Sequence, residues 1–271
     1  MKRFLIFIGM VIMALNISAQ RTAILVAQFG TSNTEGMKAA PETVLQEIKE
    51  SHPEAEVREA YTSPTIRRIL DKRGIHKESV TDALLHLHLD GYERVFVQPT
   101  FLLDGIEMDI LRKEVNQVVA FFQEVKVGCP LLYQIDDFKK LVSILGTEHP
   151  AQKGEAVVYV GHGNNQASTS TYSMIANMLH AAGQGQAFVG TVEGWPDLEQ
   201  SVNQLAGHKF KKVILVPLLL SCGVHTHEDI DGEWKPALEK AGYAVEVYFH
   251  GLGENPAIRE MILQHLNTLM N

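Results

Sequence analysis

Hydrophobic positions along the chain form short runs that alternate with longer amphipathic segments. The short runs have the pattern of strands, as in TAILVAQFG (22–30), EVREAYTS (56–63) and RVFVQPTFLL (94–103). Between them, APETVLQEIKESH (40–52) and SVTDALLHLHLDG (79–91) repeat their apolar residues with the period of a helix. Such alternation predicts βαβ units and an α/β fold, in which helices cover both faces of a parallel sheet.

The pattern of the first half returns in the second half. EAVVYVGHGNN (155–165) echoes TAILVAQFGTS (22–32), and FKKVILVPLLLSCGVHTHEDI (210–230) echoes YERVFVQPTFLLDGIEMDI (92–110), with a proline at the same place in each. A repeat of this length predicts two lobes of the same plan, each a parallel sheet flanked by helices, with the active-site cleft between them.

These repeats place the first lobe at residues 21–137 and the second at residues 138–251. The remaining residues, 252–271, are expected to form a helix with Asn255 as its N-cap and Pro256 in its first turn. One stripe of that helix is apolar and must dock on the lobes; it consists of Ile258, Ile262, Leu266 and Leu269.

The first 19 residues have the pattern of a secretory signal peptide. MKR is a positive start, FLIFIGMVIMAL is an apolar core, and NISAQ offers small residues before Gln20. We expect cleavage after Ala19 and export of the mature chain to the periplasm. A retained membrane anchor is the alternative, although the apolar run is shorter than the ~20 residues of a spanning helix, so no span is expected after cleavage.

Composition narrows the function classes. A hydrophobic content of 45% and a charged content of 21% are typical of a globular protein with a core. The net charge of -8 and the lack of a Lys/Arg block argue against a nucleic-acid partner. Cys129 and Cys222 are too few for a disulfide scaffold, so we expect buried thiols, or one disulfide if the fold brings them together.

Candidate chemistry gathers where the predicted strands end. Ligands of such sheets bind outside the carboxyl ends of the strands. In the second half these ends carry His162, Glu193 and His225, whereas the first half has Phe29 where the second has His162, and Glu107 where it has His225. The chain is an internal repeat in which only the second half carries histidines at its strand ends. This difference predicts a ligand-binding site at the cleft between the lobes.

Two histidines and one glutamate from separate strand ends match an open divalent-metal site, which leaves positions free for a substrate. Taken singly, His162 is also compatible with a structural role, and Glu193 with pairing to a helix N-terminus. His227 is expected to point outward, because alternate positions of an extended segment face opposite sides. His86 and His88 lie on a predicted helix as an ordinary pair.

Several short motifs of this chain occur together. They are GHG, VEGWPD, LLLSCGVHTHEDI and GLGENPAIRE, with FGTS, VQPT, YTS before IRRIL and the WK pair at 234–235. In this combination the chain resembles the anaerobic sirohydrochlorin cobaltochelatases of the CbiK type. These belong to the class II chelatases, which include ferrochelatase. The similarity runs from about Ala23 to the C-terminus. It implies insertion of Co²⁺ or Fe²⁺ into the tetrapyrrole sirohydrochlorin without ATP or a permanent cofactor, the metal ion being a substrate.

By this resemblance the metal ligands fall on His162, Glu193 and His225. His162 and Glu193 are the expected catalytic residues, with His162 as the base that takes pyrrole protons. Phe101 and Met108 are expected to make the mouth of the first lobe apolar. The expected tetrapyrrole-binding residues lie in the first lobe: Phe29, Gly30, Thr31, Ser32, Gln98 and Glu107.

Two classes of function stay open from the sequence. The first is a chelatase that acts on a tetrapyrrole and a divalent metal ion. The second is an exported protein of the same fold that binds haem or another tetrapyrrole, or removes iron from haem, and the predicted signal peptide favours that setting. The oligomeric state, including a homo-oligomer, is also left open.

Overall fold

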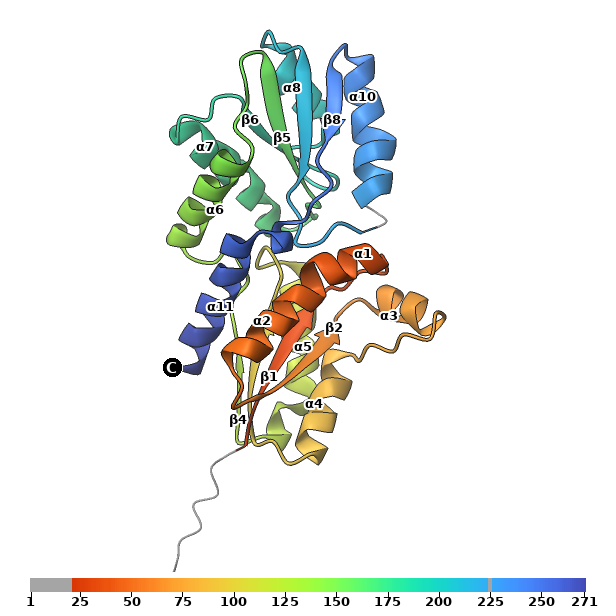
Figure 1. Cartoon of the computed structure of the whole chain (residues 1–271), viewed down its shortest axis with the longest axis vertical. Helices are drawn as coiled ribbons and strands as arrows, with labels where there is room; N and C mark the ends of the chain where they lie inside the picture. Colours follow the sequence, from red (N-terminus) through yellow and green to blue (C-terminus); the bar gives the residue numbers. More distant parts are fainter. Residues whose placement is uncertain (1–20, 224–225) are drawn as a thin grey trace, which may run out of the picture.

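We describe the chain from a computed structural model, which places residues 21–223 and 226–271. The predicted signal peptide and His225 therefore lie outside the described residues. Two lobes lie one above the other along the longest axis of the molecule (Figure 1). Each lobe has one sheet of four parallel strands with helices on both faces, so the predicted α/β class with two similar lobes is confirmed.

The two sheets have the same order of strands, β2-β1-β3-β4 and β6-β5-β7-β8. The first sheet consists of β1 (Thr22–Gln28), β2 (Glu56–Tyr61), β3 (Arg94–Pro99) and β4 (Glu124–Val127). The second consists of β5 (Glu155–Gly161), β6 (Ala187–Thr191), β7 (Lys212–Pro217) and β8 (Ala244–Val247). In both lobes the first strand lies inside the sheet and is almost completely buried, which explains its continuous apolar run.

Helices of the first lobe cover its sheet on two sides. They are α1 (Thr34–Met37), α2 (Thr43–Ser51), α3 (Pro64–Asp71), α4 (Val80–Leu89) and α5 (Ile106–Val118). A π-helical turn joins α1 to α2. The apolar side chains of α4 and α5 pack on one face of β1, and those of α2 pack on the other.

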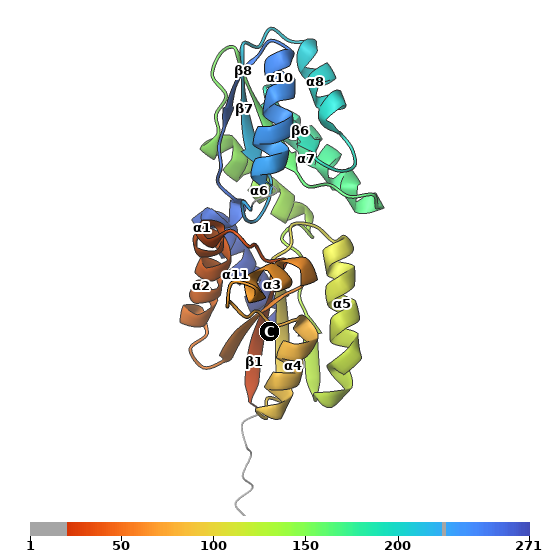
Figure 2. The same cartoon turned by 90° about the vertical axis from the view of Figure 1, so that its right-hand side faces the viewer.

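The second lobe follows the same plan (Figure 2). Its helices are α6 (Ile135–Glu148), α7 (Ser170–Ala181), α8 (Leu198–Ala206) and α10 (Lys235–Lys240). Helices α6 and α7 pack on one face of β5, and α8 and α10 on the other. Helix α6 begins at Ile135, slightly before the expected start of this lobe, and its buried side chains pack in the same apolar cluster as β5 and α7.

The last helix, α11 (Pro256–Met270), returns to the first lobe and contacts both β3 and α6. Asn255 caps it, because the side chain accepts a hydrogen bond from the backbone N–H of Ala257. Ile258, Ile262 and Leu266 are buried in a core that also contains residues of both sheets. One continuous apolar core therefore joins the lobes.

The carboxyl ends of the two sheets face each other. Gly105, after β3, lies against Ser168 and Asn164, which follow β5, because a Cβ at Gly105 would lie 3.0 Å from the Ser168 hydroxyl. Gly36, after β1, lies against Cys222, which follows β7. Loops of the two lobes thus meet at the place where ligands of such sheets bind.

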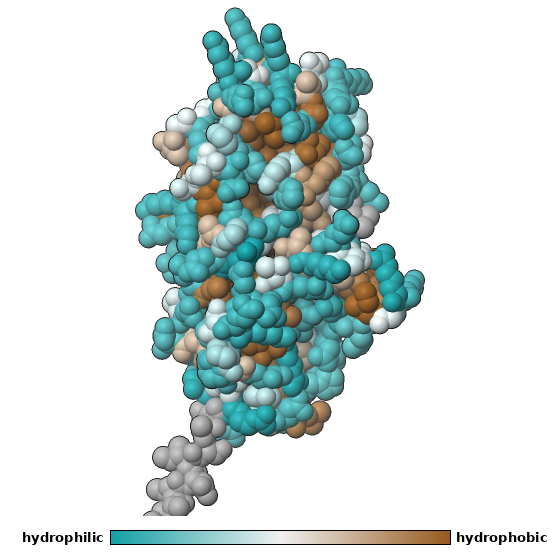
Figure 3. Space-filling model, in the orientation of Figure 1, coloured by the Kyte–Doolittle hydropathy of each residue, from teal (hydrophilic) through white to brown (hydrophobic). Residues whose placement is uncertain are grey.

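The face of the molecule drawn in Figure 3 is mostly hydrophilic, with smaller apolar areas over both lobes. Over residues 21–223 and 226–271, no helix has the length and apolarity needed to cross a bilayer. Both cysteines are free thiols. Cys222 is buried as expected, whereas Cys129 is partly exposed.

Candidate active site

His162 follows β5 directly, and its imidazole is exposed at the end of the second sheet that faces the first lobe. Its Nδ1 lies 3.0 Å from the carbonyl oxygen of Gly163. A carbonyl can only accept a hydrogen bond, so Nδ1 must carry the proton. The neutral ring therefore presents the lone pair of Nε2, which can bind a metal ion or accept a proton.

Glu193 lies beside His162 at the end of the neighbouring strand. Its backbone N–H donates to the His162 carbonyl over 2.6 Å, and the N–H of Val192 donates to the Gly161 carbonyl over 3.0 Å. These bonds extend the pairing of β5 with β6 beyond the strands themselves. The Glu193 side chain is also exposed. The structure therefore places the backbones of His162 and Glu193, two of the three predicted metal ligands, side by side.

Glycines permit this close approach of the two loops. Gly163 has a φ of +76°, and a Cβ there would lie 1.5 Å from the Glu193 carbonyl oxygen. Gly194 has a φ of +102°, and a Cβ there would lie 2.6 Å from the Asn164 carbonyl oxygen. Both positions require a left-handed backbone and lack room for a side chain. The glycines of the GHG and VEGWPD motifs are therefore needed for the backbone conformation that lets the two loops pack.

Tyr172, on α7, contacts the His162 loop through Gly163. This residue was not predicted from the sequence. Its buried hydroxyl accepts a hydrogen bond from the Gly163 N–H over 3.3 Å. Burial raises the pKa of Tyr172 to about 12; the hydrogen bond from Gly163 opposes the rise, and the negative charge of Glu107 adds to it. The charge of Glu107, on α5 of the first lobe, therefore affects the pKa of Tyr172, which contacts the His162 loop of the second lobe.

The third predicted ligand, His225, lies outside the described residues. The chain on either side of it is held in place: the Gly223 N–H donates to the Thr226 hydroxyl over 3.1 Å, and a Cβ at Gly223 would lie 3.0 Å from the Thr31 hydroxyl. Among the residues that the structure places, no three His, Cys, Asp or Glu side chains are close enough to hold a metal ion. His162 and Glu193 are only two.

The other predicted histidines lie away from this pair or have partners of their own. His227 is exposed, and its ring stacks on Phe249 with 4.1 Å between the ring centroids. His86 forms an ion pair with Glu78, and His88 stacks on Phe121.

The expected tetrapyrrole-binding residues of the first lobe differ in exposure. Phe29 is 49% exposed and, with Gly30, lines a small cavity of about 40 Å³, which Leu220 and Ser221 of the second lobe also line. Thr31 and Ser32 are buried where the lobes meet.

Gln98 is also buried, inside β3, and its side-chain amide donates to the carbonyl of Pro99. Phe101 and Met108, expected at the mouth of the first lobe, are instead buried in its core, so that expectation is wrong. Their apolar side chains fill the space between β3 and the helices, where burial is most favourable. Exposed apolar surface at the strand ends comes instead from Phe29 and from Trp195, which is 53% exposed.

Known proteins resemble this chain over nearly its whole length. The family model described as cobalt chelatase (CbiK) matches residues 22–271. Sirohydrochlorin cobaltochelatase of Salmonella typhimurium is 32% identical over 257 residues, which cover 93% of this chain and 97% of that protein. Sirohydrochlorin cobaltochelatase CbiKC of Nitratidesulfovibrio vulgaris is 29% identical over 259 residues, 93% of this chain and 91% of that protein.

Solved structures agree on the fold. SirB from Bacillus subtilis with Fe³⁺ superposes with a TM-score of 0.67 at 16% identity, covering 92% of this chain and 95% of that one. A sirohydrochlorin chelatase SirB from Bacillus subtilis subspecies spizizenii, in complex with cobalt, gives a TM-score of 0.65 at 16% identity over 93% and 96% of the two chains. Identity this low supports the shared fold alone. With the family match and the cobaltochelatase relatives, it follows that the chain belongs to the CbiK cobalt chelatase family.

Proposed function

We propose that this protein inserts Co²⁺ into sirohydrochlorin without ATP and without a permanent cofactor, the metal ion being a substrate. The observation that carries the proposal is the exposed Nε2 of His162, left free by the bond of Nδ1 to Gly163 and placed beside Glu193. The names of its relatives supply the tetrapyrrole and the metal.

His162 serves as both ligand and base in this proposal. A tetrapyrrole loses two pyrrole protons as a divalent ion enters it. The single lone pair of Nε2 can bind the ion or accept a proton, but not both at once. His162 therefore releases the ion to the pyrrole nitrogens first, the freed Nε2 then takes one proton from the macrocycle, and the second proton passes to water.

Glu193 contributes a negative charge next to His162. A carboxylate and an imidazole together bind a divalent cation more strongly than a neutral imidazole alone. By the family resemblance, His225 is the third ligand. Three protein ligands leave coordination positions open, so the pyrrole nitrogens can replace them one after another. A closed site with four protein ligands would hold the ion too firmly for transfer.

The macrocycle needs a flat apolar surface as well as the ion. Phe29 of the first lobe and Trp195 of the second are exposed aromatic side chains in strand-end loops. Aromatic rings stack on conjugated macrocycles, with ~0.5–1.5 kcal/mol beyond the burial of apolar area. We propose that these two rings bind the tetrapyrrole over the metal ligands.

The test is metal insertion by the purified mature protein, followed by absorption spectra. Sirohydrochlorin with Co²⁺, sirohydrochlorin with Fe²⁺, and haem are incubated separately. We expect the spectrum of cobalt sirohydrochlorin to form fastest. Loss of iron from haem without insertion into sirohydrochlorin would overturn the proposal in favour of a haem-iron-handling protein.

His162→Ala and His227→Ala provide a matched pair for the same assay. His162→Ala should lower the insertion rate by at least the ~10²-fold that a positioned base contributes. His227→Ala should change it little, because that ring packs on Phe249. Equal loss in both variants would contradict the role of His162.

We also propose that the mature chain is exported and begins near Gln20. The support is the positive and apolar pattern of residues 1–19. N-terminal sequencing of the protein from fractionated cells tests this, and an intact Met1 terminus on protein from the cytoplasmic fraction would contradict it.

A further inference from the structure

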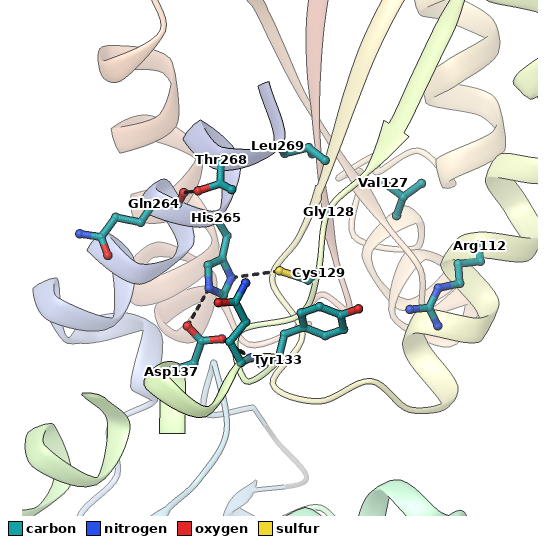
Figure 4. Close-up of a pocket in the computed structure, with 11 residues that line it drawn as sticks. Arg112, Val127, Gly128, Cys129, Tyr133, Asp137, Gln264, His265, Thr268 and Leu269 are labelled. Carbon is teal, nitrogen blue, oxygen red and sulfur yellow. Dashed lines mark hydrogen bonds and ion pairs between the residues drawn. The ribbon is translucent and has the colours of Figure 1, made fainter. Parts of the chain in front are cut away.

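Three side chains that are not among the predicted metal ligands form a chain of polar contacts beside the last strand of the first sheet. Cys129 Sγ lies 3.6 Å from Nδ1 of His265, and Nε2 of His265 lies 3.0 Å from a carboxylate oxygen of Asp137. Figure 4 shows the imidazole between the thiol and the carboxylate. The thiol and the carboxylate lie at opposite nitrogens of the ring, so the three groups cannot surround one metal ion.

Three elements supply these residues. Cys129 follows β4, Asp137 lies in the first turn of α6, and His265 lies on α11. The second oxygen of Asp137 accepts backbone hydrogen bonds from Tyr133 and Gln134 over 3.1 and 2.7 Å. The carboxylate is thus fixed by the start of α6, and it holds the imidazole in turn.

The group opens into a pocket of about 570 Å³ (Figure 4). Cys129 lines the pocket and is partly exposed, so a small molecule in the pocket lies next to this residue. Arg112, which also lines the pocket, is held by both carboxylate oxygens of Asp104 over 2.7 and 2.8 Å. The exposed ring of Tyr133 lines it as well.

Geometry and electrostatics mark His265 as the group that can take the Cys129 proton, because Nε2 faces the Asp137 carboxylate and Nδ1 faces the thiol. The hydrogen bond with Cys129 raises the pKa of His265 to about 9; burial opposes the rise, and the bond with Asp137 adds to it. His265 can therefore accept the thiol proton as Cys129 reacts. The charged or titratable groups around His265 are Cys129, Asp137, Arg112 with its partner Asp104, and Tyr133.

We propose that Cys129 is a reactive thiolate site for low-molecular-weight disulfides, with His265 and Asp137 as its positioning residues. This site shares no residue with the proposed metal site. The pocket accommodates the second half of a small disulfide next to the sulfur. Cys129 is therefore a site of reversible thiol modification in a chain whose other cysteine is enclosed.

The reaction balances without a further oxidant. The Cys129 thiolate attacks one sulfur of the disulfide, and a new S–S bond forms between Cys129 and that sulfur. The original S–S bond breaks, and the second half leaves as a thiolate, which takes a proton from His265 or water. Cys129 is oxidised to a mixed disulfide, and the leaving half is reduced to a free thiol.

Cys222 is the internal control for this proposal. It is 8% exposed, and burial raises its pKa to about 12. A buried neutral thiol reacts slowly, so Cys222 should stay unmodified while the protein is folded.

The test uses the full mature chain with glutathione disulfide as the probe, followed by intact mass and peptide mapping. We expect one adduct, on Cys129, that is absent from Cys129→Ser and reversed by a reducing agent. His265→Gln should slow adduct formation at least tenfold, whereas His227→Gln should not. An adduct on Cys222 at the same rate, or an unchanged rate in His265→Gln, would overturn the proposal.

A pH profile of the wild-type reaction gives a second measure that needs no folded variant. An ordinary thiol with a pKa near 8.5 loses about tenfold in thiolate per pH unit below that value. If His265 takes the thiol proton, the rate at Cys129 in the folded chain should fall less between pH 8 and pH 6 than the rate in the urea-unfolded chain. A fall as steep as that of the urea-unfolded chain would show that the thiol is not activated.

Discussion

The two lobes share a backbone plan and differ in the side chains that it presents. Both sheets have the same strand order, and in both the innermost apolar strand is followed by an exposed ring and then by a glycine of positive φ. In the first lobe these residues are Phe29 and Gly30, and in the second they are His162 and Gly163. The repeated geometry exposes an apolar ring on one side of the junction and an imidazole on the other.

The glycines also have different neighbours. A Cβ at Gly30 would lie 2.2 Å from the ring of Tyr61, whereas a Cβ at Gly163 would lie 1.5 Å from the Glu193 carbonyl oxygen. The first lobe therefore uses this position for packing, and the second uses it to bring an acid next to the histidine. After duplication the two lobes kept the same backbone but acquired different side chains at this position, which explains why metal ligands are predicted in one half alone.

The largest effect is expected from Gly163→Ala. The new Cβ would collide with backbone at a φ of +76°, so Ala should destabilise the fold by about 3 kcal/mol and abolish metal insertion. Gly74→Ala is the matched control, because Gly74 has the same φ of +76° and no atom within 4 Å of its Cβ. Urea unfolding of both variants measures the difference, and equal losses would show that φ alone, not the approach of the Glu193 loop, matters.

A reciprocal exchange of the two rings should come next in size. His162→Phe should lower the insertion rate ~10²-fold or more. It should leave the fold intact, since the equivalent position already carries an exposed Phe29. Phe29→His should weaken tetrapyrrole affinity but leave Co²⁺ affinity in place. Insertion rates, spectral titration with sirohydrochlorin and calorimetry with Co²⁺ separate these effects. Loss of Co²⁺ binding in Phe29→His alone would reverse the assignment of the lobes.

Tyr172→Phe should have a smaller effect that is confined to the second lobe. The variant removes the acceptor for the Gly163 N–H, which costs about 1 kcal/mol of folding free energy. The His162 loop should also become less well placed, so insertion should slow by less than His162→Phe slows it. With a pKa of about 12, the hydroxyl stays neutral at working pH, so the effect should not vary between pH 6 and pH 9. A strong variation over that range would contradict a purely positioning role.

The smallest effect on metal insertion is expected at the contact of α11 with α6, where the prediction concerns the pH dependence of stability. Because its partners raise the pKa of His265 to about 9, the folded state favours the protonated ring. The stabilisation should be complete below about pH 6.5, the unfolded value, and should be lost as pH rises through about 9. Urea midpoints of wild type and His265→Gln should therefore differ at pH 6 and converge by pH 10. A difference that grows with pH would contradict this sign.

Much of the fold and part of the site could be predicted from the sequence. Apolar periodicity and the repeat identified both sheets, because buried parallel strands and amphipathic helices leave local patterns. His162 and Glu193 were predicted because they directly follow strands, and parallel strands end together at one edge of a sheet. These features depend on neighbours along the chain.

Contacts between distant elements left no such pattern. Tyr172 and Glu107 act on one loop only because the two lobes pack against each other, and Cys129 lies 136 residues from His265. Phe101 was misplaced for a related reason: the direction of a side chain after a strand depends on the turn that follows. The need for glycine at position 163 also depends on the fold, because a Cβ there would collide with the Glu193 carbonyl oxygen, which is 30 residues away in the sequence.

Anomalous X-ray scattering from crystals soaked with Co²⁺ tests the central claim most directly. We predict one strong cobalt peak at the strand ends of the second lobe, about 2.0–2.2 Å from Nε2 of His162 and bound also by Glu193. The peak should vanish in His162→Phe and persist in Phe29→His. A cobalt ion bound at the strand ends of the first lobe, with Nε2 of His162 uncoordinated, would contradict the account.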